Sequence, residues 1–267
     1  MPHAIAEGLA IFAAGLAAGT INTVVGSGTL ITFPTLLAFH YPPVLANVSN
    51  NVGLVPGVMS GVHGYRAELS GQRDRVLTLG AASLCGGLVG AILLLVLPAD
   101  AFKAIVPALI GIALVMVVIQ PWLARWVAGR QQPRNGGDGR DPADGGGGGA
   151  AAGGPVLWLL VFCTGIYGGY FGAAQGVLLI GLLGIAFTDS LQRVNAVKNV
   201  LAGVVNGTAA IVFIACTHVA WGAVALIAAG SVLGGQLGAR VGRRLPPWGL
   251  RLVIVCVGTA ALVKLLA

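Results

Sequence analysis

The chain of 267 residues is 57% hydrophobic and only 9% charged, with a mean hydropathy of +0.91. Soluble domains contain about 25% charged residues, so fifteen basic and eight acidic side chains are too few to cover a globule of this size in water. This composition also excludes a disordered chain, a collagen and a disulfide scaffold. The formal net charge of +7 does not indicate a nucleic-acid partner, because the basic residues are few and lie between apolar segments. The sequence therefore predicts an all-α polytopic membrane protein in contact with the lipid bilayer.

Long apolar segments make up most of the chain. Three stretches, 8–65, 145–188 and 199–239, contain no Asp, Glu, Lys or Arg. A helix needs about 20 apolar residues to cross the hydrocarbon core. We therefore expect about eight hydrophobic segments, at Leu9–His40, Val44–Val62, Val76–Leu97, Ala101–Val118, Val156–Phe187, Val194–Cys216, Trp221–Gly238 and Leu250–Leu266.

One segment differs from the rest in composition. Residues 129–154 read GRQQPRNGGDGRDPADGGGGGAAAGG and contain no aliphatic side chain larger than that of Ala. Such a segment cannot bury enough apolar area to offset its conformational entropy, so we expect a flexible cytoplasmic linker. It would join a first transmembrane repeat, residues 1–128, to a second, residues 155–267.

The two halves resemble each other at a constant offset of 148 positions. The segment 46–52 (ANVSNNV) aligns with 194–200 (VNAVKNV), and 86–91 (GGLVGA) aligns with 234–239 (GGQLGA). Packing motifs of small residues recur in membrane helices and could explain the glycines. They do not explain the matching asparagines, so we interpret the halves as homologous.

The arginines indicate that the two halves are inverted relative to each other. Cytoplasmic loops are rich in Lys and Arg. In the first half the arginines follow the second apolar segment, at 66–75, whereas in the second half they follow the third, at 240–251. Equivalent loops thus carry opposite signals, and we expect both termini on the outer side of the membrane.

The first apolar segment of each half is long enough to enter the membrane and return. Leu9–His40 would be about 48 Å long as a straight helix, against a hydrocarbon core of about 30 Å. Its centre reads VVGSGT, with Pro34 shortly after it, and Val156–Phe187 contains YFGAAQG at its centre. We expect each segment to be a broken or re-entrant hairpin of two short helices.

Three stretches together resemble a known family. The sequences GSGTLITFPTLL (26–37), ANVSNNVGLVPGVMSGVHGYR (46–66) and GGQLGARVGRRLPPWGLR (234–251) are similar to those of the TauE/SafE family. The resemblance extends over nearly the whole chain outside the linker, although Ser27 and Thr29 stand where the family often has glycines. It implies a multi-pass permease of the bacterial inner (plasma) membrane. The implied substrate is a sulfur oxyanion or an organosulfonate such as sulfite.

No acidic residue lies in the interior of an apolar segment. Because carboxylates inside a membrane mark cation sites and proton relays, we expect neither a cation substrate nor proton coupling through a carboxylate. The polar residues that remain are neutral or basic. Two matched sets are spaced i, i+3 and i+4, so that each shares one helix face: Asn47, Asn50 and Asn51 in the first half, and Asn195, Lys198 and Asn199 in the second.

These sets and the two glycine-rich interruptions together predict an anion site. A broken membrane helix exposes N–H groups at the start of its second piece, and Gly lets an anion approach that backbone. Two alternatives remain open: the asparagines and glycines could only pack helices, and Lys198 could extend to the cytoplasmic interface near Arg193. The expected substrate-binding residues are Gly26, Ser27, Gly28, Thr29, Asn47, Asn50, Asn51, Gly172, Gln175, Gly176, Asn195, Lys198 and Asn199.

His63, three residues before Arg66, is a candidate gate or proton carrier, although a histidine without a role is an alternative. The four cysteines lie singly in apolar segments without a C-x-x-C motif, so we expect neither a metal nor a cofactor. No catalytic triad is present, which argues against an enzyme. The predicted function is secondary transport of a small anion, with export favoured. The alternative is a non-transporting membrane protein, either a thiol-redox or assembly factor or a structural subunit, and a homo-oligomer is left open.

Overall fold

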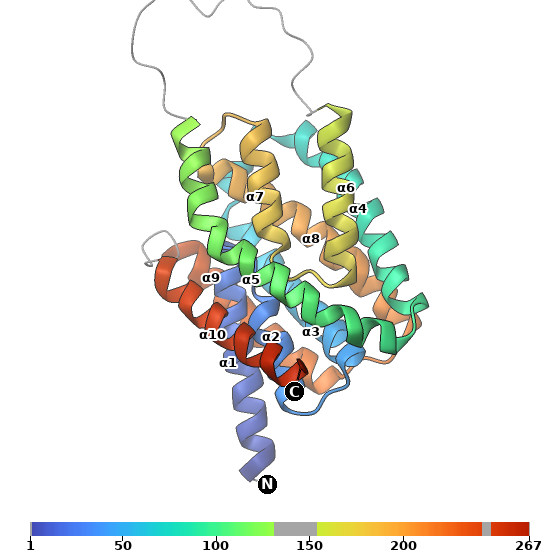
Figure 1. Ribbon diagram of the computed structural model, residues 1–267. Helices are drawn as coiled ribbons and strands as arrows, with labels where there is room; N and C mark the ends of the chain where they lie inside the picture. The colour runs from blue at the N-terminus through green and yellow to red at the C-terminus, as the bar shows by residue number, and fades with distance from the viewer. Residues whose placement is uncertain (1, 131–153, 242–246, 267) are drawn as a thin grey trace, which may run out of the picture.

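The computed structural model describes residues 2–130, 154–241 and 247–266 (Figure 1). The described residues form ten α-helices and one short 3-10 helix, which agrees with the prediction of an all-α protein. The elements are α1 (Pro2–Val24), α2 (Thr29–Ala38), α3 (Pro43–Gly64), η1 (Arg66–Leu69), α4 (Arg73–Val96), α5 (Ala99–Arg130), α6 (Pro155–Tyr170), α7 (Gln175–Ala186), α8 (Leu191–Cys216), α9 (Trp221–Val241) and α10 (Pro247–Leu266).

Several helices are suited to crossing a bilayer. α3 has 22 residues but carries Asn47, Asn50 and Asn51, whose side chains are buried against protein. α2, α6 and α7 are shorter, with 10, 16 and 12 residues. Five described stretches are both long and apolar enough to span a membrane: Ala4–Val24, Arg73–Val96, Ala99–Leu123, Leu191–Cys216 and Trp221–Arg240.

The first apolar segment of each half contains two helices separated by a tight turn. Gly26, between α1 and α2, has a φ of 89°, and Gly172, between α6 and α7, has a φ of 77°. A side chain with a Cβ atom disfavours this left-handed region, so glycine allows the chain to end one helix and start another. In Figure 1, α6 runs from the upper end of the molecule to its middle, and α7 lies beside it in the same upper part.

Helices of one half pack on helices of the other in a reciprocal pattern. α1 packs along α9 and α6 packs along α4, while α3 and α8 contact α9 and α4 respectively. Small residues permit this close approach, because a Cβ atom on Gly15 would lie only 2.9 Å from the backbone of Ile227. A Cβ atom on Gly165 would similarly lie 3.1 Å from Cα of Gly86. Packing therefore accounts for these glycines.

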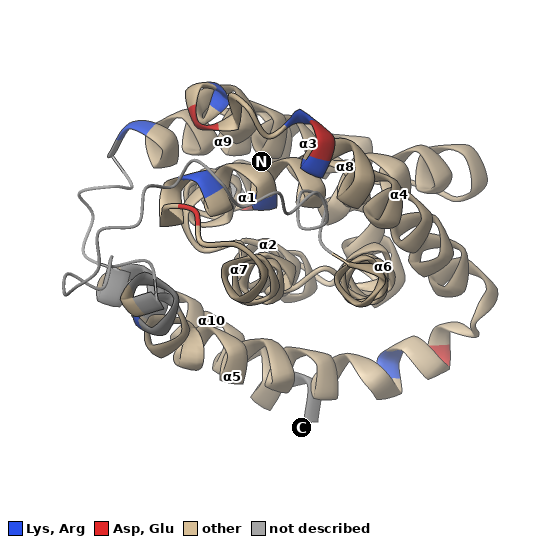
Figure 2. Cartoon of the chain, turned by 90° about the horizontal axis from the view of Figure 1, so that it is seen from above, with Lys and Arg blue, Asp and Glu red and all other residues tan. Residues whose placement is uncertain are grey.

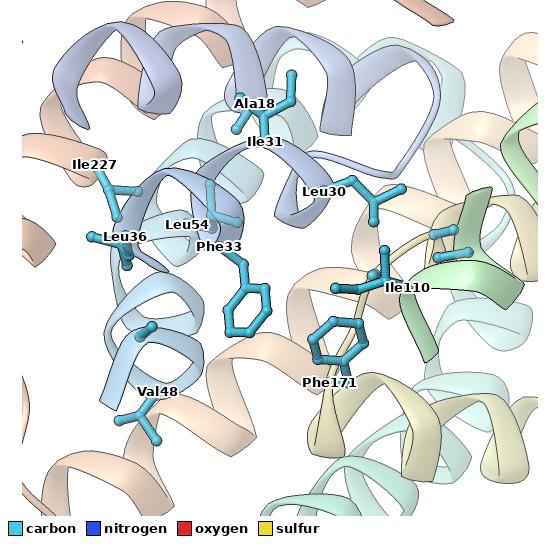
Figure 3. Packing of buried hydrophobic residues seen from close by; sticks show 14 of the residues in the cluster. Ala18, Leu30, Ile31, Phe33, Leu36, Val48, Leu54, Ile110, Phe171 and Ile227 are labelled. Atoms are coloured by element: carbon cyan, nitrogen blue, oxygen red, sulfur yellow. The ribbon is translucent and has the colours of Figure 1, made fainter. Parts of the chain in front are cut away.

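The apolar core lies around the two turns. The rings of Phe33 in α2 and Phe171 in the second turn meet edge to face, with centroids 5.3 Å apart (Figure 3). Phe171 also contacts Phe102 of α5, at 6.3 Å. Viewed from above, α5 and α10 lie on one side of α2 and α7, and α9, α3 and α8 lie on the other (Figure 2).

Two features differ from the sequence-based boundaries. We expected the fourth segment to end at Val118, but α5 continues to Arg130 and accommodates Pro107 and Pro121. Gly129 and Arg130, which we placed at the start of the linker, are therefore part of this helix. Residues 131–153 of the predicted linker, and the arginines at 243 and 244, lie outside the described residues.

Candidate functional site

A small polar cavity lies where the two turns meet. Its volume is about 20 Å³, enough for one water molecule. The turns and the adjoining helix ends contribute Asn22, Thr23, Gly26, Thr29, Gly172, Gln175 and Gly176. The central helices α3 and α8 contribute Val58, Lys198, Asn199, Ala202 and Asn206.

The cavity brings together predicted residues from both halves. Gly26, Thr29, Gly172, Gln175, Gly176, Lys198 and Asn199 all line it. The other predicted residues, Ser27, Gly28, Asn47, Asn50, Asn51 and Asn195, are not among the lining residues. The expected list also omitted Asn22 and Asn206, although each is a lone amide in an apolar stretch and Asn206 lies two turns beyond Asn199 on the same helix face.

Lys198 is the charged residue of the cavity and is fully buried, with an exposed fraction of 0%. Its Nζ donates to the carbonyl oxygens of Asn22, at 3.0 Å, and Thr23, at 3.4 Å. These carbonyls belong to the C-terminal end of α1, where a helix has unsatisfied acceptors and a partial negative charge. A protonated lysine has three N–H protons, so in that form these two bonds leave one proton for a ligand in the cavity.

The alternative in which Lys198 extends to the cytoplasmic interface is wrong. The side chain points from α8 to the end of α1 in the interior, and not along α8 to Arg193. The physical reason is that the carbonyls of Asn22 and Thr23, at the end of α1, lack the partners within the helix that a continuous helix would give them, so they accept hydrogen bonds from Lys198.

Two asparagines bind the interrupted helices reciprocally. Asn47 of α3 donates through Nδ2 to the carbonyl of Tyr170 at the end of α6, at 2.9 Å. The equivalent residue of the other half, Asn195 of α8, donates to the carbonyl of Thr23 near the end of α1, at 3.1 Å. Each central helix thus satisfies an acceptor on the broken helix of the opposite half. For these two side chains the geometry agrees with the packing interpretation.

The remaining asparagines have different surroundings. Asn50 accepts a hydrogen bond from the Thr32 hydroxyl and donates to Oγ1 of Thr29 at 3.4 Å, so it holds the first turn of α2. Asn199 approaches the carbonyl of Thr23 at 3.5 Å and also lines the cavity. The Oδ1 atom of Asn51 is buried without a hydrogen-bond partner in the described part of the chain.

The backbone donors of the two turns are less available than we expected. The N–H of Gly28 already donates to Oδ1 of Asn22, at 2.7 Å. The N–H of Gly176 donates to the carbonyl of Gly26, at 3.2 Å. In this conformation the end of α1 and the other turn therefore supply acceptors for these two groups.

Unpaired polar atoms remain at the site. Nε2 of Gln175 and Oγ of Ser27 are buried and have no hydrogen-bond partner among the described residues. Their residues are only 3% and 1% exposed. A buried donor without an acceptor is costly and calls for a ligand or a water molecule. Gln175 lines the cavity, so its amide is available to a ligand there.

His63 lies away from the cavity. It is exposed at the end of α3, and its Nε2 is 2.9 Å from Nη1 of Arg66. The four cysteines are free and exposed. Within the described ranges no cluster of His, Cys, Asp or Glu could hold a metal ion.

Charged residues connect the two halves at the end where η1 lies. Asp189, between α7 and α8, forms ion pairs with Arg75 of α4 and, at 3.2 Å, with Arg193 of α8. The Arg75 guanidinium also lies 4.1 Å from the ring centre of Phe187. Burial alone would raise the pKa of Asp189, but the two arginines outweigh it and hold this pKa below its usual value.

Membrane-spanning helices with two interrupted helices around a buried polar cavity are the architecture of a membrane transporter. The chain belongs to the family described as sulfite exporter TauE/SafE, whose sequence profile matches residues 11–265. This finding confirms the resemblance and identifies the chain as a transporter and not an enzyme.

Curated relatives agree with this assignment. The chain is 26% identical to "Probable membrane transporter protein ORF9" of Sinorhizobium sp., over 96% of this chain and 91% of that protein. It is also 26% identical to "Probable membrane transporter protein YfcA" of Escherichia coli (strain K12), over 96% of this chain and 88% of that protein. A "Probable membrane transporter protein" of Haemophilus influenzae is 26% identical over 86% of this chain. No solved structure matches the chain.

Proposed function

We propose that this transporter is a secondary permease of a bacterial inner membrane that exports a small sulfur oxyanion or organosulfonate, such as sulfite. One observation carries the proposal: a fully buried lysine, Lys198, faces a cavity whose described lining contains no acidic side chain. Ionisable residues inside a membrane protein mark substrate or ion pathways. A site with donors and one ammonium group is suited to an anion.

The proposed binding groups come from both turns and from α8. The ammonium of Lys198 has a free proton, and the amides of Gln175 and Asn199 line the same cavity. Thr29 adds a hydroxyl at the start of α2. The remaining residues expected at the site, among them Asn47, Asn50 and Asn195, position these groups through the hydrogen bonds described above.

Binding requires a change of shape at the turns. The cavity accepts about one water molecule, whereas sulfite has four heavy atoms and a sulfonate has more. We propose that the hydrogen bond between Gly26 and Gly176 opens when the anion binds, which frees the N–H of Gly176 as a further donor.

Two inverted repeats would allow the substrate site to open to each side of the membrane in turn. We propose that residues 1–128 and 155–267 are two transmembrane repeats of opposite orientation, joined by a cytoplasmic linker. The reciprocal packing of α1 on α9 and of α6 on α4 supports this symmetry. The matched bonds of Asn47 and Asn195 to the opposite half also support it. Substrate sites at the interface of inverted repeats are exposed to one side at a time when the repeats rock.

Flux through purified protein in proteoliposomes tests the proposal. The wild type is loaded in turn with sulfite, sulfate, thiosulfate and short sulfonates, and at least one of these anions should leave faster than from protein-free vesicles. Lys198→Met and Asn199→Leu should each abolish that flux, because both side chains line the cavity. Lys103→Met is the matched control, since Lys103 is an exposed lysine of α5 paired with Asp100. Wild-type flux in both cavity variants would refute this site.

A further inference from the structure

Four helix ends and one basic side chain determine the electrostatics of the cavity. Four helix ends meet there: the C-terminal ends of α1 and α6, and the N-terminal ends of α2 and α7. A helix end carries about half an elementary charge, negative at the C-terminus and positive at the N-terminus. The two negative and two positive ends oppose one another, so a protonated Lys198 adds one positive charge to the site.

The two halves are unequal at this position. At the offset of 148, the equivalent of Lys198 is Asn50, a neutral residue that is 1% exposed and bound to Thr29 and Thr32. Among the described lining residues Lys198 is the one charged side chain. The unpaired amide of Gln175 can orient an oxygen atom of the ligand but adds no charge.

We propose that the site selects singly charged tetrahedral anions over doubly charged anions of the same shape. This inference rests on the proposed anion transport and adds the charge of the substrate. A monoanion beside the Lys198 ammonium forms a neutral pair, whereas a dianion leaves one negative charge buried without compensation. The cost of burying an ion rises with the square of its charge in the Born description, and an uncompensated buried charge is strongly unfavourable. A sulfonate or hydrogen sulfite fits this requirement, whereas sulfate does not.

Three compounds of nearly equal shape test the inference: dimethyl sulfone is neutral, methanesulfonate has one negative charge, and sulfate has two. Binding is measured as the shift in thermal unfolding of the detergent-solubilised full chain, and flux of the two anions is measured in proteoliposomes. We expect methanesulfonate to bind wild-type protein at least about 100-fold more tightly than sulfate and than dimethyl sulfone.

Variants that remove or add one positive charge at the site should change the preferred charge of the anion. Lys198→Met should lower methanesulfonate affinity at least about 100-fold without lowering that for dimethyl sulfone. Asn206→Lys, which adds a basic group at a residue that lines the cavity, should raise sulfate affinity relative to methanesulfonate. Lys103→Met, on exposed α5, should leave all three affinities unchanged.

The outcomes separate this inference from the proposed function. If wild-type protein binds and moves sulfate as well as methanesulfonate, the charge selection is wrong although anion transport stands. If no anion binds or moves in folded wild-type protein, both proposals are wrong. If Asn206→Lys does not fold, the comparison of wild type with Lys198→Met still decides, because equal discrimination against sulfate in both proteins would overturn the role of Lys198.

Discussion

The backbone N–H of Gly176 donates a 3.2 Å hydrogen bond to the carbonyl oxygen of Gly26, so the two helix interruptions of this transporter touch each other directly. The contact is close because neither residue has a side chain. A Cβ atom on Gly26 would lie 2.5 Å from Cα of Gly176, and a Cβ atom on Gly176 would lie 2.5 Å from Cα of Gly26. This contact forms one wall of the proposed anion site.

Replacing Gly26 by Ala should destabilise the protein and stop transport. The new methyl group would press on the backbone of Gly176, and the φ of 89° would add strain of about 1–3 kcal/mol. Thermal unfolding in detergent and flux in proteoliposomes measure the two effects. Gly80→Ala is the control, since a Cβ atom there meets nothing within 4 Å and should stabilise helix α4 by up to about 1 kcal/mol. A Gly26→Ala protein as stable and active as wild type would contradict the close contact.

The reciprocal asparagine bonds predict a loss of stability in both variants, but of unequal size. Asn47→Ala leaves the carbonyl of Tyr170 without its side-chain donor, and Asn195→Ala removes a donor from Thr23. Each change should cost about 1–3 kcal/mol, because a buried acceptor loses its partner. The loss should be smaller for Asn195→Ala, since Thr23 keeps its contacts to Lys198 and Asn199. Equal losses of stability in the two variants would show that the remaining contacts of Thr23 do not compensate for the lost Asn195 bond.

The sequence predicted the helices and the two interruptions better than the contacts of the polar side chains. Composition and the length of the first apolar segment in each half were enough to expect an all-α membrane protein with breaks near Gly26 and Gly172. Spacing at i, i+3 and i+4 predicts that Asn195, Lys198 and Asn199 share a face, but it does not reveal what that face contacts. The partner of Lys198 is the end of α1 in the other half, about 175 residues away along the chain.

The end of α5 shows a second limit of prediction from the sequence. Gln120 and Pro121 follow the apolar run that we ended at Val118, and proline disfavours the interior of a helix in water. In the protein α5 continues through Pro121 to Arg130. Membrane helices tolerate proline because neighbouring groups satisfy the freed carbonyl, and local sequence does not show whether such groups are present.

The ion pairs of Asp189 predict a dependence of stability on pH. Arg75 and Arg193 hold the pKa of Asp189 below its ordinary value, which is about 3.9 in model peptides. The stabilisation is therefore complete above the ordinary pKa and is lost as the pH falls through the lower pKa of the folded protein. Asp189→Asn should be about 1–3 kcal/mol less stable than wild type near neutral pH, and this difference should shrink in acid.

Thermal unfolding of both proteins across a pH series measures this dependence. Asp100→Asn is the control, because the Asp100 side chain is 94% exposed and its pair with Lys103 should contribute little. A difference between Asp189→Asn and wild type that stays constant down to strong acid would show that the ion pairs do not stabilise the fold.

The membrane potential should drive export without a coupled ion. The described lining of the cavity has no carboxylate to carry a proton, and His63 lies away from it, exposed beside Arg66. An inside-negative potential contributes about 2.3 kcal/mol per charge per 100 mV and expels an anion. Since about 1.4 kcal/mol corresponds to a tenfold ratio, 100 mV could keep a monoanion roughly 50-fold more dilute inside than outside. Efflux from proteoliposomes should therefore rise with an imposed potassium–valinomycin potential at equal pH on both sides, and His63→Ala should behave like wild type. Efflux that ignores the potential and follows a proton gradient would rule out this mechanism, and loss of that efflux in His63→Ala would identify His63 as the proton carrier.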